Sequence, residues 1–181
     1  MNKHIYMVRH CEAVGQPPDS QLTEKGFKQA LQLADFLNQF GIDRIIASPF
    51  LRAVQSIGPF AKRVNLEVEI DERLSERVLS SKSLPDWMNK LEATFRNMEL
   101  TYEGGESSQE AMNRIQKVVD EITTSDFNSN VFVTHGNIMS LLLNSYDKNF
   151  GFEKWKSLSN PDVFLLQMPS TNFQIKHLWK A

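Results

Sequence analysis

Ile5-Tyr6-Met7-Val8-Arg9-His10 is a short apolar run of β-strand character that ends in two basic residues. Val131-Phe132-Val133-Thr134-His135-Gly136-Asn137 has the same arrangement, and an apolar helical segment, 138–143, follows it. Ligands of parallel α/β sheets bind beyond the carboxyl ends of the strands. If the two runs are neighbouring parallel strands, His10 and His135 face each other across one crevice at the edge of the sheet.

The rest of the chain alternates between short β-like runs and long helical periods, which is typical of helices packed on a mainly parallel sheet. Besides the strands at 5–8 and 131–134, the pattern predicts four more at 44–47, 67–70, 163–166 and 173–175. The last two should form an antiparallel hairpin, joined by a turn that contains Pro169. The sequence therefore predicts an α/β fold with a six-stranded sheet.

Two helices are expected around the strand at 44–47. Apolar residues repeat at helical spacing from Phe27 to Phe40 after the N-cap candidate Thr23, and Gly41 supplies a stop. The second helix is expected to start at Ser48-Pro49, with Ser48 as N-cap and Pro49 at the first helical position. Arg52 would then lie within about one turn of the helix start, and its guanidinium could reach past the end of the strand.

Two further helices are expected in the second half of the chain. Ser107 and Glu110 form a capping box ahead of an amphipathic pattern over 111–122. A weaker pattern from Pro85 to Met98 indicates a lid-like helix. Several apolar residues in or near this segment could contact an apolar leaving group, although core packing is the more frequent use of such residues. They are Trp87, Met88, Met98, Tyr102 and Met112.

Composition restricts the class of partner. The chain has 181 residues, 41% of them hydrophobic, which favours a single domain over 1–181. Lys and Arg total 20 against 22 Asp and Glu, so the net charge of −2 gives no global field that would attract nucleic acid or an anionic membrane. Cys11 has no internal disulfide partner, and the sequence shows neither a signal peptide nor a membrane-length apolar run. We therefore expect a cytoplasmic protein that acts on a small ligand, and its oligomeric state is left open.

The expected crevice is rich in cations. Arg9 lies beside the two histidines, and Arg52 reaches in from the neighbouring helix. Such a cluster repels itself unless an anion occupies it, and bidentate Arg with protonated His holds a phosphoryl group well. The helix start after His135 adds backbone N–H donors, with Gly136 allowing a close approach of the backbone. Asn137 is either a phosphate contact or a helix cap.

A reaction follows from this pocket. A neutral imidazole at His10 can attack phosphorus, while Arg9, Arg52 and His135 stabilise the charge on the equatorial oxygens. Phosphorylated His10 would be the intermediate. The leaving alcohol needs a proton and the attacking water must later lose one, so a carboxyl group is expected near the opposite face of phosphorus.

Six spaced motifs, covering about residues 4 to 143, resemble those of the histidine phosphatase superfamily, the phosphoglycerate-mutase-like proteins, and occur in the family's order. They are Val8-Arg9-His10-Cys11-Glu12, Leu22-Thr23-Glu24-Lys25-Gly26-Phe27-Lys28-Gln29-Ala30, Ser48-Pro49-Phe50-Leu51-Arg52-Ala53, Arg73-Leu74-Ser75-Glu76-Arg77, Gly104-Gly105-Glu106-Ser107 and Thr134-His135-Gly136-Asn137.

The resemblance implies a three-layer sandwich with a central mixed sheet, with His10 as nucleophile. It implies that Arg9, Arg52 and His135 complete the phosphate pocket, that Glu76 lies at the position of the family's general acid, and that no metal or other cofactor takes part. Where the family usually has Gly after the nucleophile, this chain has Cys11. The compact chain is more similar to the family's monoesterases than to its mutases.

The sequence thus indicates a metal-independent phosphomonoesterase that hydrolyses small phosphate esters through phosphorylated His10, with Glu76 exchanging the proton. Alternative carboxyl groups are Asp71, Glu72 and Glu106. Alternative functions are a phosphoglycerate mutase, a protein-phosphohistidine phosphatase and a non-catalytic module that binds a phosphorylated ligand. Cys11 is interpreted as a space-filling residue, with a redox-sensitive thiolate as the alternative.

Overall fold

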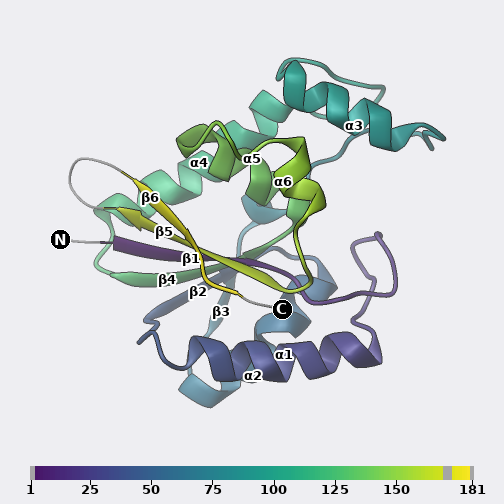
Figure 1. The fold of residues 1–181 in the computed structure, drawn as a ribbon. Helices are drawn as coiled ribbons and strands as arrows, with labels where there is room; N and C mark the ends of the chain where they lie inside the picture. The colour runs from purple at the N-terminus through teal and green to yellow at the C-terminus, as the bar shows by residue number, and fades with distance from the viewer. Residues whose placement is uncertain (1–2, 169–172, 180–181) are drawn as a thin grey trace.

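The computed structural model describes residues 3–168 and 173–179, and a six-stranded mixed sheet lies at its centre (Figure 1). The strand order is β3-β2-β4-β1-β5-β6. The four strands from β3 to β1 run parallel, whereas β5 is antiparallel to β1 and β6 is antiparallel to β5. The predicted fold is confirmed, and the predicted turn at Pro169 lies outside the described residues. The strands are β1 (Lys3–Arg9), β2 (Arg44–Ala47), β3 (Val68–Ile70), β4 (Ser129–Thr134), β5 (Asp162–Met168) and β6 (Gln174–His177).

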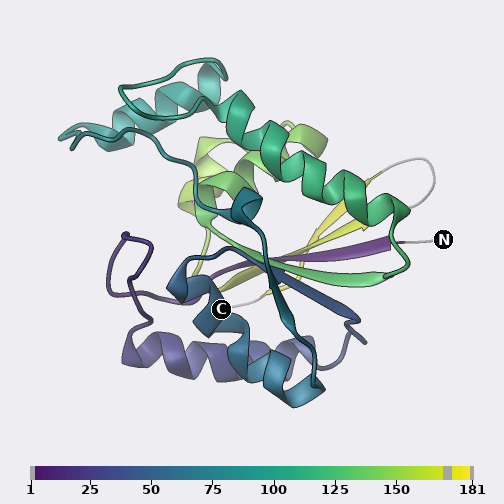
Figure 2. The same cartoon turned by 180° about the vertical axis from the view of Figure 1, so that it is seen from behind.

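Helices cover both faces of the sheet, giving the expected three layers (Figures 1 and 2). On one face lie α1 (Glu24–Leu37) and α2 (Leu51–Val64). On the other lie α4 (Ser108–Thr124), α5 (Gly136–Tyr146) and the short α6 (Phe152–Lys156), with α3 (Trp87–Arg96) standing farther from the sheet. A 3₁₀ turn, η1 (Glu72–Leu74), follows β3. None of the helices in the described residues is long and apolar enough to cross a bilayer.

Two hydrophobic cores form on the two faces because side chains alternate along each strand. In β1, Ile5 and Met7 contribute to the core under α4 and α5, whereas Tyr6 and Val8 contribute to the core under α1 and α2. All residues of β4 are buried, as expected for a central strand with both faces covered. This burial fixes β1 and β4 in the middle of the molecule, where their carboxyl ends meet.

The capping box at the start of α4 is confirmed. Glu110 N–H donates to Ser107 Oγ at 3.0 Å, and Ser107 N–H donates to Glu110 Oε2 at 2.7 Å. Thr23 is confirmed as the N-cap of α1, since its Oγ1 accepts from Gly26 N–H at 2.9 Å. This helix ends at Leu37, three residues before the predicted Phe40, and Gly41 takes a positive φ of 58° in the turn beyond.

The predicted start of α2 is wrong. The helix begins at Leu51, its N-cap residue is Phe50, and Pro49 lies outside it. Ser48 does not cap the helix because its hydroxyl is bound to His135 Nε2 at 2.7 Å, while accepting from Phe50 N–H at 3.2 Å. Arg52 is nevertheless in the first turn, so the expectation for its side chain is unaffected.

Gly26 joins α1 to the loop that follows β1. A Cβ at this position would lie 2.0 Å from the carbonyl oxygen of Glu12. The same carbonyl accepts from Thr23 N–H at 3.0 Å, and Glu12 Oε1 accepts from Thr23 Oγ1 at 2.9 Å. The start of α1 therefore holds the chain just after His10, and only glycine allows so close an approach.

Gly26→Ala should lower the free energy of unfolding by about 3 kcal/mol or more, because a backbone oxygen would have to move to admit the methyl group. Gly151→Ala is the matched control, since no atom lies within 4 Å of its added Cβ, and it should change stability by at most about 1 kcal/mol. Urea unfolding of both variants measures the difference. Equal losses would contradict the close approach.

Candidate active site

The structure brings His10 and His135 together at the carboxyl ends of β1 and β4. Arg9 and Thr134 are paired residues in the parallel ladder, so the residues that follow them lie side by side. The two imidazole rings have centroids 5.1 Å apart and meet at 60°. Arg9 and Arg52 also reach this point, as expected from the sequence.

Two contacts fix the orientation and tautomer of His10. Its Nδ1 lies 2.6 Å from the carbonyl oxygen of Cys11, and its Nε2 lies 3.2 Å from Arg52 Nε. Because the guanidinium can only donate, Nε2 is the acceptor and Nδ1 carries the proton. Burial lowers the pKa of His10 to about 3, an effect opposed by the Cys11 carbonyl and reinforced by Arg52 and Arg9. His10 is therefore a neutral imidazole with its Nε2 lone pair on the side of Arg52.

His135 is fully buried. Its Nε2 lies 2.7 Å from Ser48 Oγ, and the Phe50 ring packs against it with centroids 4.7 Å apart. Burial places the pKa of His135 well below its usual value, and His10, Arg52, Arg114 and Arg9 lower it further. Burial keeps His10 neutral, as expected for the nucleophile. We expected protonated histidine beside it, but burial keeps His135 neutral too, so the two arginines supply the positive charge.

Main-chain carbonyls hold both arginines in place. Arg9 Nη1 donates to Leu158 O at 2.9 Å and to Ser159 O at 3.3 Å. Arg52, only 2% exposed, donates from Nη1 to Gln16 O and Pro17 O, both at 2.9 Å. Burial lowers the pKa of each guanidinium, and the charge of Glu76 raises it. The two cations are thus fixed before any ligand arrives.

Unpaired buried polar atoms gather at this site. Five buried side-chain nitrogen or oxygen atoms have no hydrogen-bond partner within the described part of the chain, and four of them belong to Arg9, His135 and Asn137. They are Arg9 Nε, His135 Nδ1, Asn137 Nδ2 and Asn137 Oδ1. Since buried polar groups are normally paired, this concentration indicates a place for a polar ligand.

Glu76 occupies the start of α5. Its Oε2 accepts from Asn137 N–H at 3.1 Å, and its Oε1 accepts from Ile138 N–H at 3.0 Å and Arg77 N–H at 2.9 Å. The helix N-terminus that we expected to face phosphate is therefore satisfied by a carboxylate, which suits its positive dipole end. The cap interpretation of the Asn137 side chain is wrong, because the N-cap residue is His135 and no side chain caps the helix there.

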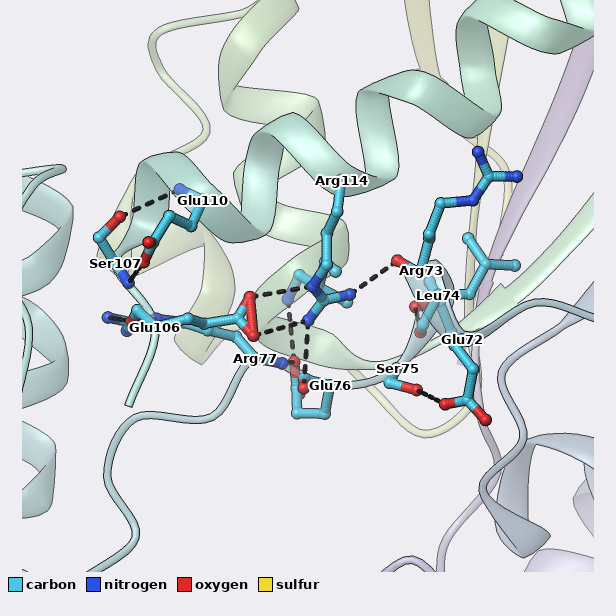
Figure 3. Close-up of polar contacts among 12 residues, drawn as sticks. Glu72, Arg73, Leu74, Ser75, Glu76, Arg77, Glu106, Ser107, Glu110 and Arg114 are labelled. Carbon is cyan, nitrogen blue, oxygen red and sulfur yellow. Dashed lines mark hydrogen bonds and ion pairs between the residues drawn. The ribbon is translucent and has the colours of Figure 1, made fainter. Parts of the chain in front are cut away.

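Arg114 on α4 holds the segment that carries Glu76 (Figure 3). It donates from Nη1 to Arg73 O at 2.7 Å and from Nη2 to Glu76 O at 3.3 Å, while its Nε lies 2.9 Å from Glu106 Oε1. From below, Thr134 Oγ1 donates to Leu74 O at 2.6 Å. The backbone at Glu76 is thereby fixed from a helix and from a strand.

The four candidate carboxyl groups differ in surroundings. Asp71 is bound to the Arg73 guanidinium at 2.6 Å, Glu106 is paired with Arg114, and Glu72 is exposed. Glu76 is the one of the four that lines the main pocket. The geometry thus favours Glu76 over the other three for contact with a substrate.

The main pocket has a volume of about 800 Å³ and extends from the start of α5 to α3. Arg9, Glu76, Gly136 and Asn137 line one end. A Cβ at Gly136 would lie 3.1 Å from Arg9 Nε, so a side chain there would crowd the guanidinium. The other lining residues are Gln16, Arg77, Leu79, Trp87, Met88, Leu91, Trp155, Lys156, Leu158 and Asn160. Among the described residues, no group of three or more His, Cys, Asp or Glu side chains is placed to hold a metal ion.

Cys11 is buried, and its N–H donates to Ser56 Oγ at 2.8 Å. Burial raises the pKa of its thiol to about 11. A protonated, inaccessible thiol favours the space-filling interpretation over the redox-sensitive one.

Sequence reasoning missed several residues at the site. The sequence pattern predicts a helix cap at Ser48 and gives no role to Arg114 or to Asn160, whose Nδ2 donates to His10 O at 2.8 Å. Trp155, at the edge of the pocket, was also overlooked. Only the Ser48-Pro49 motif carried a signal, because it directly follows a strand end.

A protein-family model described as the histidine phosphatase superfamily (branch 1) matches residues 5–179 of the sequence. Phosphoserine phosphatase 1 of Hydrogenobacter thermophilus is 29% identical over 71% of this chain and 68% of that protein. A probable phosphoglycerate mutase of Erwinia tasmaniensis is 31% identical over 78% of this chain and 73% of its own. A solved mycobacterial glucosyl-3-phosphoglycerate phosphatase shares the fold with a TM-score of 0.81 at 21% identity, covering 98% of each chain.

The buried, neutral His135 predicts a loss of stability in acid. Its folded-state pKa is below the ordinary value of 6.5, so below this pH the unfolded chain binds a proton that the folded protein does not. The stabilisation is complete above pH 6.5 and falls as the pH drops. His135→Asn should reduce this slope by about 1.4 kcal/mol per pH unit in mild acid.

Urea unfolding at several pH values in phosphate-free buffer measures the slope. Phe50→Leu is the control, because it changes packing against the His135 ring without removing a titratable group, and it should lower stability about equally at each pH. An unchanged slope in His135→Asn would contradict the prediction.

Proposed function

The chain belongs to the histidine phosphatase superfamily, and from this membership and the geometry around His10 we propose that it is a metal-independent phosphomonoesterase acting on small phosphate esters. The observation that carries the proposal is the neutral His10 ring, with Nδ1 bound to the Cys11 carbonyl and Nε2 turned toward Arg52. In this tautomer Nε2 has the lone pair that a nucleophile needs. We also propose that 1–181 acts as one cytoplasmic domain, in keeping with its free, buried Cys11 thiol.

In the first step, His10 Nε2 forms a bond to phosphorus as the ester P–O bond breaks. The ring keeps its Nδ1 proton and gains positive charge, which the Cys11 carbonyl stabilises at 2.6 Å. Arg52 Nε, 3.2 Å from Nε2 before reaction, is placed to move its hydrogen bond to a phosphoryl oxygen. Glu76 enters this step as the carboxylic acid, gives its proton to the leaving alkoxide and becomes the carboxylate.

The unpaired buried groups support binding of the phosphoryl oxygens. Arg9 Nε–H and Asn137 Nδ2–H are donors, and His135 Nδ1 is a third donor in the tautomer whose Nε2 accepts a hydrogen bond from the Ser48 hydroxyl. A phosphoryl group offers acceptors to all three, so it would satisfy donors that have no partner among the described residues. Substrate binding and transition-state stabilisation thereby use the same donors.

In the second step, a water molecule attacks phosphorus on phosphorylated His10 and gives its proton to the Glu76 carboxylate. The P–N bond breaks, inorganic phosphate leaves and His10 returns to the neutral form. Glu76 is protonated again for the next ester, so the enzyme neither gains nor loses a proton over the cycle.

Phosphoglycerate mutase activity is the second candidate, because a relative of that name is 31% identical to the chain. Phosphorylated His10 would then return its group to a sugar-acid hydroxyl instead of water. Isomerisation of a phosphoglycerate without release of inorganic phosphate distinguishes this activity from hydrolysis.

His10→Ala should abolish both turnover and covalent labelling, because the proposed intermediate is a phosphoimidazole. Brief incubation with a reactive phosphate ester in the presence of a chelator, followed by mass spectrometry under alkaline conditions, locates the label. Cys11→Ala is the matched control beside it and should still be labelled at His10. Normal turnover by His10→Ala, or activity that requires an added metal ion, would overturn the mechanism.

Glu76→Gln should slow esters of basic alcohols by about 10²-fold to 10⁴-fold, the usual contribution of general acid catalysis. An activated aryl phosphate should be much less affected, because its leaving group departs with little need of a proton. Single-turnover measurement of phosphoenzyme formation isolates the step in which the acid acts. An equal, small loss on both substrates would show that Glu76 is not the acid.

A further inference from the structure

The wall of the pocket that faces the proposed phosphate site is apolar. Six of its lining residues are Leu79, Trp87, Met88, Leu91, Trp155 and Leu158. We propose that this wall binds an aromatic leaving group, so that phosphate monoesters of arylalkyl alcohols are preferred substrates. The inference rests on the proposed phosphatase function and adds the class of alcohol.

Two apolar residues of α3, Trp87 and Met88, belong to neither of the two hydrophobic cores. Trp87 is 47% exposed and Met88 is 39% exposed, although both line a pocket of about 800 Å³. Such a volume is typical of sites for small organic molecules, and a phosphoryl group fills only a small part of it. Large apolar side chains left exposed around a hollow are typical of a ligand-binding surface.

Trp155 connects this wall to the phosphate end. A Cβ at Gly136 would lie 3.4 Å from Trp155 Nε1 and 3.1 Å from Arg9 Nε. The indole and the guanidinium therefore both lie next to Gly136. Trp155 in turn meets Trp87 edge to face, with ring centroids 6.4 Å apart. A substrate ring held a few bonds from phosphorus would therefore contact Trp155 first and Trp87 beyond it.

The wall is supported from behind by further aromatic packing. The Phe152 ring stacks on Trp155 with centroids 5.5 Å apart at 22°, and Phe95 of α3 meets Phe152 at 6.0 Å. These contacts link α6 to α3 and hold the two tryptophans in position. Rigid aromatic surfaces of this kind bind rings with little loss of side-chain entropy.

The cations in this half of the pocket are already engaged. Lys156 Nζ lies 3.5 Å from Glu153 and 5.4 Å from the centre of the Phe152 ring. The buried Arg77 donates to Glu106 O at 2.9 Å and to Thr94 Oγ1 at 2.9 Å. In this half of the pocket, a carboxylate on the leaving group, as in a serine or glycerate ester, would meet only these two cations, and both already have other partners. An uncharged aromatic alcohol fits this wall better.

The test compares three esters of primary alcohols, so that the demand for a proton at the leaving oxygen stays similar. They are 3-phenylpropyl phosphate, propyl phosphate and phosphoserine. The wild-type kcat/KM for the phenylpropyl ester should exceed that for the propyl ester by roughly 10-fold or more, since burying even one extra methylene is worth about that factor. Phosphoserine should be no better than propyl phosphate.

Trp87→Ala should reduce the ratio of kcat/KM for phenylpropyl to propyl phosphate by several fold. Phe27→Ala is the matched control, since Phe27 is similarly exposed, at 45%, but lies on α1 outside the pocket lining, and its ratio should equal that of the wild type. Competitive inhibition by 3-phenylpropylphosphonate and propylphosphonate gives the same comparison for binding alone.

The outcomes separate the two proposals. Equal kcat/KM for the phenylpropyl and propyl esters, with turnover that depends on His10, would overturn the aromatic site and leave the phosphatase proposal standing. Absence of turnover of all three esters would contradict the phosphatase proposal. The comparison of the two phosphonates would still show whether the apolar wall binds an aromatic ring. Preference for phosphoserine over both alkyl esters would also overturn the inference.

Discussion

Arg9 pairs with Thr134 in the parallel ladder of β1 and β4, and the rest of the site depends on this pairing. The next residue on each strand is a histidine, so one hydrogen-bonded register places two imidazoles 5.1 Å apart between centroids. A shift of one residue would turn one of them to the opposite face of the sheet. The register is secured by burial, because the apolar side chains of both strands fill the cores on the two faces.

The site is arranged to receive an anion. Two guanidinium groups are fixed by carbonyl oxygens, both histidines are neutral because they are buried, and donors on Arg9, His135 and Asn137 lack partners in the described part of the chain. Such an arrangement lowers stability locally, yet it avoids reorganisation when a phosphoryl group binds. Glu76 contributes a carboxylate that accepts hydrogen bonds from the start of α5.

The sequence predicted the parts of this site that depend on local pattern. Apolar runs ending in His10 and His135, and Arg52 near a helix start, specify where each side chain leaves the backbone, and the topology then brings them together. Ser48 shows the limit of such reasoning. A Ser-Pro pair before a helix is normally a cap, but here the Ser48 hydroxyl is hydrogen-bonded to His135, which lies 87 positions away in the chain.

The same limit applies to Glu76 and Arg114. Family resemblance could place Glu76 near the pocket, but its hydrogen bonds to the start of α5 join segments 61 and 62 positions apart. Arg114 approaches from a third element, and its partners at Arg73 and Glu76 are main-chain carbonyls, which carry no sequence signal. Long-range contacts of this kind follow from packing and could not be predicted from local periodicity.

Figure 1 shows α3 standing apart from the sheet, beyond the helices that cover it. Of the residues proposed for chemistry, Arg9, His10, Arg52 and His135 lie at strand ends or in a first helical turn, next to the cores, and Glu76 lies in the loop after η1, whereas Trp87 and Met88 lie on this outlying helix. Substitutions at the exposed Trp87 and Met88 can therefore alter the pocket wall with little effect on folding. A lineage could acquire a new substrate range by drift in this helix alone while inheriting an unchanged reaction centre.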